Sequence, residues 1–288
     1  MSDLIGQGSG QSDTVFIRTK SKVSEISDDA QDRNRLWWEW LPMTYADWDG
    51  HDRLPATDQD LRNIEDALLG ESPFLRTYFD FSRFKCKTVL DLGCGSGVLS
   101  CCFAKQGAQV TGIDLTETGV TLAKRNARAQ GLDVTVARMN AEEMAFASNS
   151  FDYVFSWGVL HHTKDMSVAL REVNRILKPG GEGLMMVYHR NSIVYYLHGL
   201  FWLLFRGKIL LGHNFESVQD FYTDGYYHHY LTTRELAGRL QDAGLTPIRA
   251  HITQYQKKIL PMIPNWLDSY LKNRFGMCLI YEFSKAKW

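Results

Sequence analysis

Val89-Leu90-Asp91-Leu92-Gly93-Cys94-Gly95-Ser96-Gly97 is the stretch that decides the fold, because an apolar strand runs directly into closely spaced glycines and then into a helix. Glycine lets a backbone pass close to a ligand and adopt dihedral angles that other residues resist. Dinucleotide-binding enzymes space such glycines as GxGxxG to bind a pyrophosphate. Here the last glycine comes one position early and Val98 stands where it would be needed. The spacing therefore argues against NAD and FAD as ligands.

Two acidic residues near this loop narrow the choice of ligand. Asp91, at the end of the strand, would repel a pyrophosphate but can organise an ammonium group through water or backbone. Asp114 ends the next strand-like run, VTGIDL, where a carboxylate can accept the hydroxyl groups of an adenosine ribose. NAD uses the same arrangement, so Asp114 alone does not identify the ligand. Together the two carboxylates suit a nucleoside that carries an amino acid better than a dinucleotide.

Short β-rich runs alternate with helical runs over residues 88–283. The apolar positions from Met166 to Leu177 recur with the spacing of one buried helical face. After a long insertion, Thr232 and Glu235 form the signature of a capping box at the start of a further helix. Strands that alternate with helices of this length predict an α/β fold with a doubly wound, mostly parallel sheet.

The composition limits the kinds of partner. The formal net charge is −1 and the isoelectric point is about 6.8, so no overall basic field indicates a nucleic-acid partner. The chain has five cysteines, an odd number that cannot all pair in disulfides, and they lie mainly in apolar stretches. We therefore expect reduced thiols in a cytoplasmic protein. The first residues lack both the basic start and the apolar core of a secretory signal.

The segment from Ile193 to Leu211 is rich in large apolar residues, which raises the question of whether it spans a membrane. Its longest uninterrupted apolar run, Leu200 to Phe205, falls far short of the ~20 residues that a spanning helix needs. We therefore expect no transmembrane segment. A cap over a pocket, a partner-facing surface and an interfacial helix all remain open for this segment.

Several motifs, taken in order, resemble the class I S-adenosylmethionine-dependent methyltransferases. The resemblance is close over about residues 85–190 and looser in the C-terminal part. It rests on DLGCGSG at 91–97, GIDL at 112–115, NAEE at 140–143, FDYVFS at 151–156, LHH at 160–162 and LKPGG at 177–181. The resemblance implies a Rossmann-like methyltransferase fold with a seven-stranded sheet. It also implies that the chain is an enzyme that uses S-adenosylmethionine and releases S-adenosylhomocysteine.

The chain then divides into five expected parts. We expect a flexible tail at 1–28, an N-terminal helical and aromatic lid at 29–84, and an S-adenosylmethionine-binding core at 85–190. A cap insertion on the substrate side follows at 191–231, and residues 232–288 complete the core sheet. Thr57 is expected to cap a helix within the lid.

The resemblance also assigns residues to the cofactor. The glycines of the loop line its methionine end, Asp91 organises its amino group, and Asp114 takes the ribose. Asn140 stands where the family often has Asp beside the adenine amino group. This is a departure from the family pattern, but the amide oxygen of Asn140 can still accept a hydrogen bond from that amino group. Ser156 and Trp157 would face the sulfonium and the acceptor. The expected cofactor-binding residues are Asp91, Gly93, Cys94, Gly95, Gly97, Asp114, Leu115, Asn140, Ala141, Glu142, Ser156 and Trp157.

Each of these positions also has a purely structural interpretation. Glycine-rich turns between a strand and a helix occur without any ligand, and an aspartate at a strand end can simply cap a helix. Cys94 is better explained as a small loop residue than as a nucleophile, because no histidine lies near it in sequence to activate it.

Histidines are the candidate general bases. His161, His162, His228 and His229 follow strands or precede the last expected helix, so their loops belong at the carboxyl edge of the sheet, where ligands bind. Structural roles in the loops are the alternative for all four. Histidines on several loops would also permit a metal site, but no close ligand spacing supports one and we expect none.

The acceptor must be recognised by the lid and the insertion, because the core binds only the cofactor. The expected pocket wall is aromatic, although ordinary packing between cap and body would also account for such residues. The wall comprises Trp38, Tyr45, His189, Tyr195, Tyr196 and Tyr226.

These observations favour methyl transfer to a small-molecule acceptor, at a hydroxyl oxygen of a natural product or of a sugar-bearing or lipid-like intermediate. Methylation of nitrogen on an amine or a protein is the first alternative, and a non-catalytic binding scaffold is the second. We expect no nucleic-acid partner, interfacial membrane contact stays open, and the chain could be a monomer or a homodimer.

Overall fold

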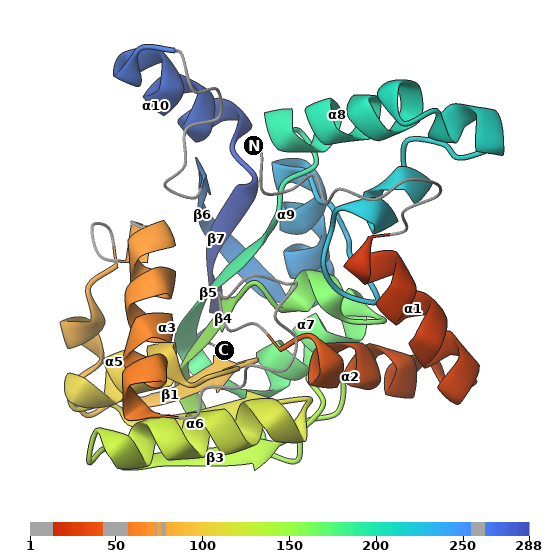
Figure 1. Ribbon diagram of the computed structural model, residues 1–288. Coiled ribbons are helices and arrows are strands. Elements are labelled where there is room, and N and C mark those ends of the chain that lie inside the picture. The colour runs from red at the N-terminus through yellow and green to blue at the C-terminus, as the bar shows by residue number, and fades with distance from the viewer. Residues whose placement is uncertain (1–13, 43–56, 73, 76–78, 255–262, 288) are drawn as a thin grey trace.

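The computed structural model describes residues 14–42, 57–72, 74–75, 79–254 and 263–287. Its centre is a seven-stranded sheet in the order β3-β2-β1-β4-β5-β7-β6 (Figure 1). Strands β1 to β5 run parallel, whereas β7 runs antiparallel to both β5 and β6. The prediction of a seven-stranded, mostly parallel sheet is confirmed. The strands are β1 (Thr88–Leu92), β2 (Gln109–Asp114), β3 (Val134–Arg138), β4 (Phe151–Trp157), β5 (Leu177–Tyr188), β6 (Leu245–Thr253) and β7 (Cys278–Lys285).

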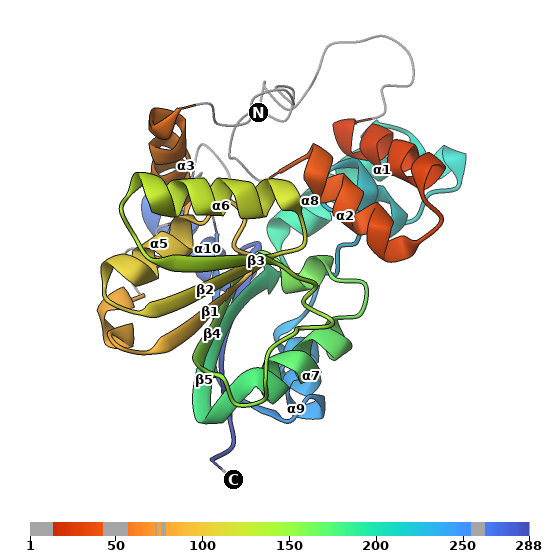
Figure 2. The ribbon, with the colours of Figure 1, turned by 90° about the horizontal axis from the view of Figure 1, so that it is seen from below.

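Helices cover both faces of the sheet, as Figure 2 shows. One face carries α3 (Asp58–Glu71), α5 (Val98–Lys105) and α6 (Glu117–Ala129), and its core includes the edge-on rings of Phe79, Phe103 and Phe155. The other face carries α7 (Met166–Ile176) and α9 (Thr233–Asp242). In the central strands β1, β4 and β5, residues on both faces are therefore mostly buried, as is usual for parallel strands between two layers of helices.

The expected helix starts at Thr57 and Thr232 are present. Each threonine accepts a hydrogen bond from the third residue of its helix, and the side chains of Asp60 and Glu235 return the bond to the cap. Both capping boxes satisfy backbone groups that a helix end leaves without partners.

The remaining helices gather at the carboxyl edge of the parallel strands. They comprise α1 (Val15–Ile26), α2 (Ala30–Trp40), α8 (Ile193–Leu200), the π-helical turn η3 (Phe201–Phe205), the 3-10 turns η2 (Leu160–His162), η4 (Lys208–Leu211) and η5 (Ser217–Phe221), and α10 (Asn265–Phe275). A further 3-10 turn, η1 (Phe81–Phe84), precedes β1. In the described residues, no helix has the length and apolar content needed to cross a bilayer.

The expectation of a flexible tail through residue 28 is wrong for Val15–Ile26. Thr14 caps this helix, and Val23 is fully buried where α1 packs against α2. Lys20 also forms an ion pair with Asp220 of the insertion, with 2.8 Å between Nζ and Oδ1. The burial of α1 depends on packing against other elements and on an ion pair 200 residues away in sequence, so the polar composition of the region gave no sign of it.

Candidate functional site

A cavity opens at the carboxyl ends of β1, β2 and β4, beneath α2. The glycine loop after β1 forms its floor, and the side chains of Gln31, Asn34 and Trp38 on α2 form part of its roof. Its walls continue to the end of β5 at Tyr188 and into the insertion at Asp224. The cavity therefore joins the part of the sheet expected to bind a nucleoside to the part nearest the insertion.

The glycine loop has the backbone that its sequence requires. Gly93 and Gly97 have positive φ angles of 78° and 75°, and a Cβ at either position would lie within 3 Å of Val159 or Ala123 respectively. Gly95 also has a positive φ, but a Cβ there would meet nothing within 4 Å. Gly93 and Gly97 thus serve packing and chain direction, whereas Gly95 leaves open space beside the cavity that it lines.

Asp114 ties the loop to the next helix. Its carboxylate accepts hydrogen bonds from the Gly95 N–H at 2.9 Å, the Thr116 N–H at 2.9 Å and the Thr116 hydroxyl at 2.6 Å. Burial raises the pKa of Asp114, with the hydrogen bonds acting in the opposite direction. A carboxylate has about four acceptor positions, so three are used within the protein and roughly one is left for a ligand hydroxyl. The structural and the ligand-binding interpretations of Asp114 are therefore compatible.

Asp91 is buried under the loop and lines the same cavity. Burial raises the pKa of Asp91 to about 6, although the Ser100 hydroxyl donates a 2.6 Å hydrogen bond that favours the charged form. A cationic group placed beside Asp91 would stabilise the carboxylate and lower its pKa again. The site thus has an acceptor for an ammonium group at the methionine end of the expected cofactor.

The other expected cofactor residues divide into two groups. Cys94, Leu115, Asn140, Ala141 and Trp157 line the cavity. The Asn140 side-chain oxygen already accepts from the Glu142 N–H at 3.0 Å, and burial raises the pKa of the Cys94 thiol well above its ordinary value. Gly97, Glu142 and Ser156 lie off the cavity wall.

Each of these three residues has another position in the structure. Gly97 caps α5, and the Glu142 carboxylate accepts from the Lys164 and Asp165 N–H groups. Ser156 is buried within β4.

A polar cluster closes the end of the cavity nearest β5. The Tyr188 hydroxyl donates a 2.7 Å hydrogen bond to Oδ1 of Asp224, and both side chains are buried. His162 joins them, with its ring 5.5 Å from that of Tyr188 and 4.9 Å from that of Trp38. The Nδ2 group of Asn34 donates to the carbonyl of His162 at 3.0 Å, while Oδ1 of Asn34 is buried with no hydrogen-bond partner among the described residues.

The proton of His162 can be placed from its partner. Its Nδ1 atom lies 2.7 Å from the backbone carbonyl oxygen of Tyr227, which can only accept, so Nδ1 carries the proton. Burial lowers the pKa of His162, which makes the neutral ring the form present at pH 7. In that form Nε2 is the basic nitrogen.

The other three candidate bases lie away from the cavity. His161 is fully buried, and Nε2 of His229 forms a 3.2 Å hydrogen bond with the carbonyl oxygen of Thr163. His228 lies 3.2 Å from the Asp220 carboxylate, and burial lowers its pKa to about 4. The structure thus brings one of the four expected bases, His162, to the cavity.

The expected aromatic wall is dispersed in the same way. Trp38 lines the cavity, and Tyr45 lies outside the described residues. Tyr195 packs against Tyr230 at a ring distance of 4.7 Å, and the Tyr226 hydroxyl lies 3.3 Å from that of Ser24.

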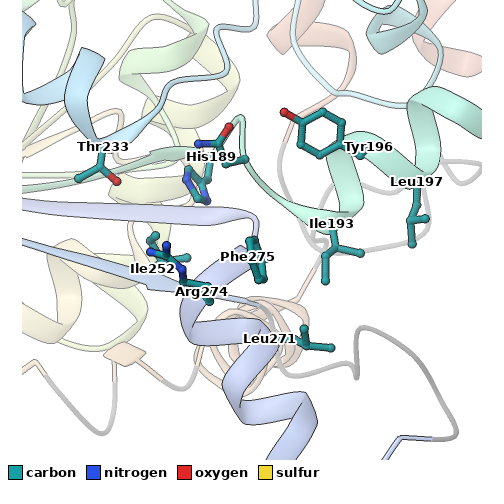
Figure 3. Close-up of a pocket in the computed structure, with 10 residues that line it drawn as sticks. His189, Ile193, Tyr196, Leu197, Thr233, Ile252, Leu271, Arg274 and Phe275 are labelled. Carbon is teal, nitrogen blue, oxygen red and sulfur yellow. The ribbon is translucent and has the colours of Figure 1, made fainter.

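His189 and Tyr196 line a second pocket, of ≈ 560 Å³, between α8 and α10 (Figure 3). The insertion therefore contributes one wall of that pocket. It also contributes Asp224 to the first cavity.

Gln31, Asn34, Tyr188 and Asp224 line the cavity but were not expected from the sequence. Tyr188 follows directly from its place at the end of the fifth strand, so topology could have indicated it. Asp224 lies in an aromatic run of the insertion with no recognisable spacing, and Gln31 and Asn34 lie in a helix far from the core in sequence. No sequence signal placed these three together. Within the described residues, no group of three or more His, Cys, Asp or Glu side chains is arranged to hold a metal ion.

Comparison with known families gives one match over residues 90–185, to a family described as a methyltransferase domain. The chain is 38% identical over 110 residues to a ubiquinone biosynthesis O-methyltransferase of Pseudomonas paraeruginosa, a match that covers 38% of this chain and 47% of that protein. It is 30% identical over 160 residues to the protein of the same name from Ruegeria pomeroyi, over 56% of this chain and 60% of that one. The chain thus spans about half the length of the curated relatives that it matches.

Solved structures of methyltransferases from other organisms share the fold. An S-adenosylmethionine-dependent methyltransferase from Methanosarcina mazei superposes with a TM-score of 0.52 at 22% identity, over 74% of this chain and 97% of that one. One from Mesorhizobium loti superposes with a TM-score of 0.51 at 20% identity, over 78% and 100% respectively.

Proposed function

Because this chain carries a methyltransferase domain of the class I S-adenosylmethionine-dependent family, we propose that it methylates a hydroxyl oxygen of a small-molecule acceptor. The acceptor class is a natural product or a sugar-bearing or lipid-like intermediate. The observation that carries the proposal is the single cavity that joins the glycine loop to the cluster of His162, Tyr188 and Asp224. One end of it suits the cofactor and the other suits a polar acceptor.

The cofactor end fits S-adenosylmethionine. Gly95 leaves open space, Asp91 can accept from the amino group, and Asp114 retains about one acceptor position for a ribose hydroxyl. Asn140 and Ala141 line the cavity beyond β3 for the adenine. When bound, S-adenosylmethionine supplies an electrophilic methyl group on a sulfonium.

The acceptor end can bind and deprotonate a hydroxyl group. His162 presents Nε2 as its basic nitrogen, because Nδ1 donates to the Tyr227 carbonyl. Asp224, held by Tyr188, and Oδ1 of Asn34 are further acceptors of hydrogen bonds in the same wall. An acceptor molecule with more than one hydroxyl group could donate to both Asp224 and Asn34, whereas an apolar molecule would leave Oδ1 of Asn34 buried without a partner.

Positioning accounts for the rest of the catalysis. Methyl transfer from a sulfonium is an in-line displacement, so its rate depends on holding the nucleophile near the methyl group and on excluding water. Trp157 at the end of β4 and Trp38 on α2 place aromatic surfaces on the wall of the cavity. We expect α2 to act as the lid that shields both ligands.

The similarity to proteins named as O-methyltransferases supports oxygen as the methylated atom. Nitrogen remains the second candidate, because the Asp224 carboxylate would also bind an ammonium group. The two differ in the role of the histidine: a hydroxyl needs a base, whereas a neutral amine does not.

The decisive test has two stages. Calorimetric titration should show binding of S-adenosylmethionine and S-adenosylhomocysteine and no binding of NAD. Transfer of a labelled methyl group should then be measured to catechols and glycosides and, in parallel, to the matching amines. Labelled methyl ethers would support the proposal, labelled amines would favour the alternative, and absence of cofactor binding would overturn both.

A further inference from the structure

Large apolar side chains are exposed at one end of the molecule. They lie on the segment from α8 to η4 and on α10, which occupy the same end in Figure 1. Helices α8 and α10 also line two sides of the pocket in Figure 3. We call this the α8–α10 surface. It consists of Tyr196, Leu197, Leu200, Phe201, Leu204, Phe205, Ile209, Leu210, Leu211, Trp266, Tyr270 and Phe275.

The exposure of these side chains is extensive. Phe205 is 82% exposed, Leu210 87% and Trp266 72%. Elsewhere in the described part of the chain, large apolar side chains are exposed only at Ile26, Trp40 and Ile248. A concentration of this kind on a single surface marks a site of interaction with a membrane or another molecule.

The exposed charged side chains within the two segments of this surface are of one sign. Residues 193–215 contain no aspartate or glutamate, whereas Arg206 and Lys208 lie between the exposed apolar side chains. On α10 the one acidic residue, Asp268, is buried and paired with Lys272, with 2.8 Å between the charged atoms. Arg274 adds a cation at the pocket. The surface therefore combines apolar and cationic groups without an exposed acidic one in its two segments.

This combination is that of a segment that lies in the interfacial region of a bilayer. Basic side chains are attracted to anionic headgroups, and tryptophan and tyrosine favour the boundary between headgroups and hydrocarbon. A second copy of this chain is a poorer partner, because two such faces would bring cations against cations. The helices involved are too short to span a bilayer.

We propose that the α8–α10 surface binds the interfacial region of an anionic lipid bilayer. Phe205, Leu210 and Trp266 insert among the acyl chains, and Arg206 and Lys208 contact the headgroups. The pocket between α8 and α10 belongs to the same surface and is lined by Ile193, Leu271 and Phe275 beside Arg274. The binding itself requires neither the cofactor nor methyl transfer.

Vesicle flotation tests the proposal. The full chain should float with vesicles of phosphatidylcholine and phosphatidylglycerol, and floating should weaken with salt and with vesicles of phosphatidylcholine alone. Phe205→Ser with Leu210→Ser should lower the apparent affinity by roughly tenfold or more, because each side chain loses its transfer into hydrocarbon. Trp266→Ser, on the other segment, should weaken binding as well.

Matched controls lie elsewhere on the surface. Ile26→Ser and Ile248→Ser remove exposed apolar side chains away from the α8–α10 surface and should leave flotation unchanged. Equal melting temperatures would show that all variants are folded.

Failure of the wild-type chain to float with anionic vesicles would overturn the proposal, as would equal loss of binding in the control variants. Light scattering tests the alternative that a second copy of this chain covers the surface. A dimer that dissociates on Phe205→Ser with Leu210→Ser, without vesicle binding, would make this face an interface between two copies.

Discussion

Asp114 connects three segments beside the proposed cofactor site through one carboxylate. It joins the end of β2 to the glycine loop through Gly95 and to the start of α6 through Thr116. Asp114→Ala should therefore weaken binding of S-adenosylhomocysteine by about tenfold to a hundredfold, because charge-assisted hydrogen bonds are lost and buried donors are left unpaired. Calorimetric titration measures the change. Unchanged affinity would remove Asp114 from the cofactor site.

Under the proposed function, His162 is the general base that takes the proton of the acceptor hydroxyl. His162→Gln should lower kcat by roughly 10²–10⁴-fold while leaving the affinity for S-adenosylhomocysteine unchanged, because a general base acts on the acceptor alone. Burial lowers the pKa of His162, so the base is neutral at pH 7 and the acid limb of kcat should lie below pH 6.5. His229→Gln is the matched control and should retain most turnover. Normal turnover of His162→Gln would exclude it as the base.

Asp91 should make cofactor affinity depend on pH. Its pKa is raised to about 6 by burial, so in the free protein the carboxyl is protonated below pH 6 and ionised above it. A ligand ammonium group favours the ionised form, and binding below pH 6 must therefore also release a proton. The affinity for S-adenosylhomocysteine should fall by about tenfold for each pH unit below 6. Asp91→Asn should bind more weakly at pH 7 and show no such slope between pH 5 and 7.

The residues that sequence motifs predicted are those whose positions follow from local geometry. The glycine loop, Asp91 and Asp114 all lie within one strand–turn–helix unit or at the end of the adjacent strand, so spacing places them. Asp224 reaches the cavity from an insertion, and its position depends on packing that no local pattern encodes. Three of four candidate histidines missed the cavity for the same reason.

Between elements, α2 is held over the cofactor cavity by its own last turn. Glu39 accepts hydrogen bonds from the Glu117 N–H at 2.7 Å and the Thr118 N–H at 3.1 Å, at the N-terminus of α6. Burial raises the pKa of Glu39, but its hydrogen bonds to Thr118 and Glu117 outweigh that effect and hold the pKa below 4.5. A carboxylate at a helix N-terminus is stabilising because it meets unpaired N–H groups and the positive end of the helix dipole.

Glu39→Gln should lower the free energy of unfolding by about 1 kcal/mol at pH 7. Because the folded-state pKa of Glu39 is depressed, its contribution is present above pH 4.5 and is lost as the pH falls through the folded value. The difference between wild type and variant should therefore shrink below pH 4.5. Denaturant unfolding at pH 7 and pH 4 measures it, with Glu25→Gln, at an exposed position of α1, as control. An equal difference at both pH values would show that the charge of Glu39 is not involved.

Elements with their own boundary signals were predicted well. The capping boxes at Thr57 and Thr232 and the apolar period of α7 each lie within a single segment, so the sequence alone locates them. Helix α1 was expected to be a tail, because its apolar residues are few and gain their burial only against α2 and η5. Helix α10 follows Pro264, whose side chain cannot cap a helix, so the sequence gave no clear signal of where this helix begins.

At the scale of the whole molecule, binding of the cofactor should stabilise the position of the N-terminal helix α2. The cavity is lined by the core and by Gln31, Asn34 and Trp38 of α2, so a cofactor bound there would contact both. Saturation with S-adenosylhomocysteine at about 100 times its Kd should add roughly 2.7 kcal/mol to stability. Limited trypsinolysis should slow at Arg33 and Arg35, with cleavage at Lys287 as the internal reference. Equal cleavage rates at α2 with and without ligand would show that α2 does not close over the cofactor.

The place of β7 in the sheet has a consequence for synthesis on the ribosome. It is the last strand in chain order, yet it lies inside the sheet between β5 and β6. While the chain is being made, β5 has an open edge and β6 has no neighbour with which to pair. An open edge of this kind is a template for pairing with another nascent chain. The sheet can close only after Cys278–Lys285 has left the exit tunnel, so protection of that edge until then falls to chaperones or to the speed of the final pairing.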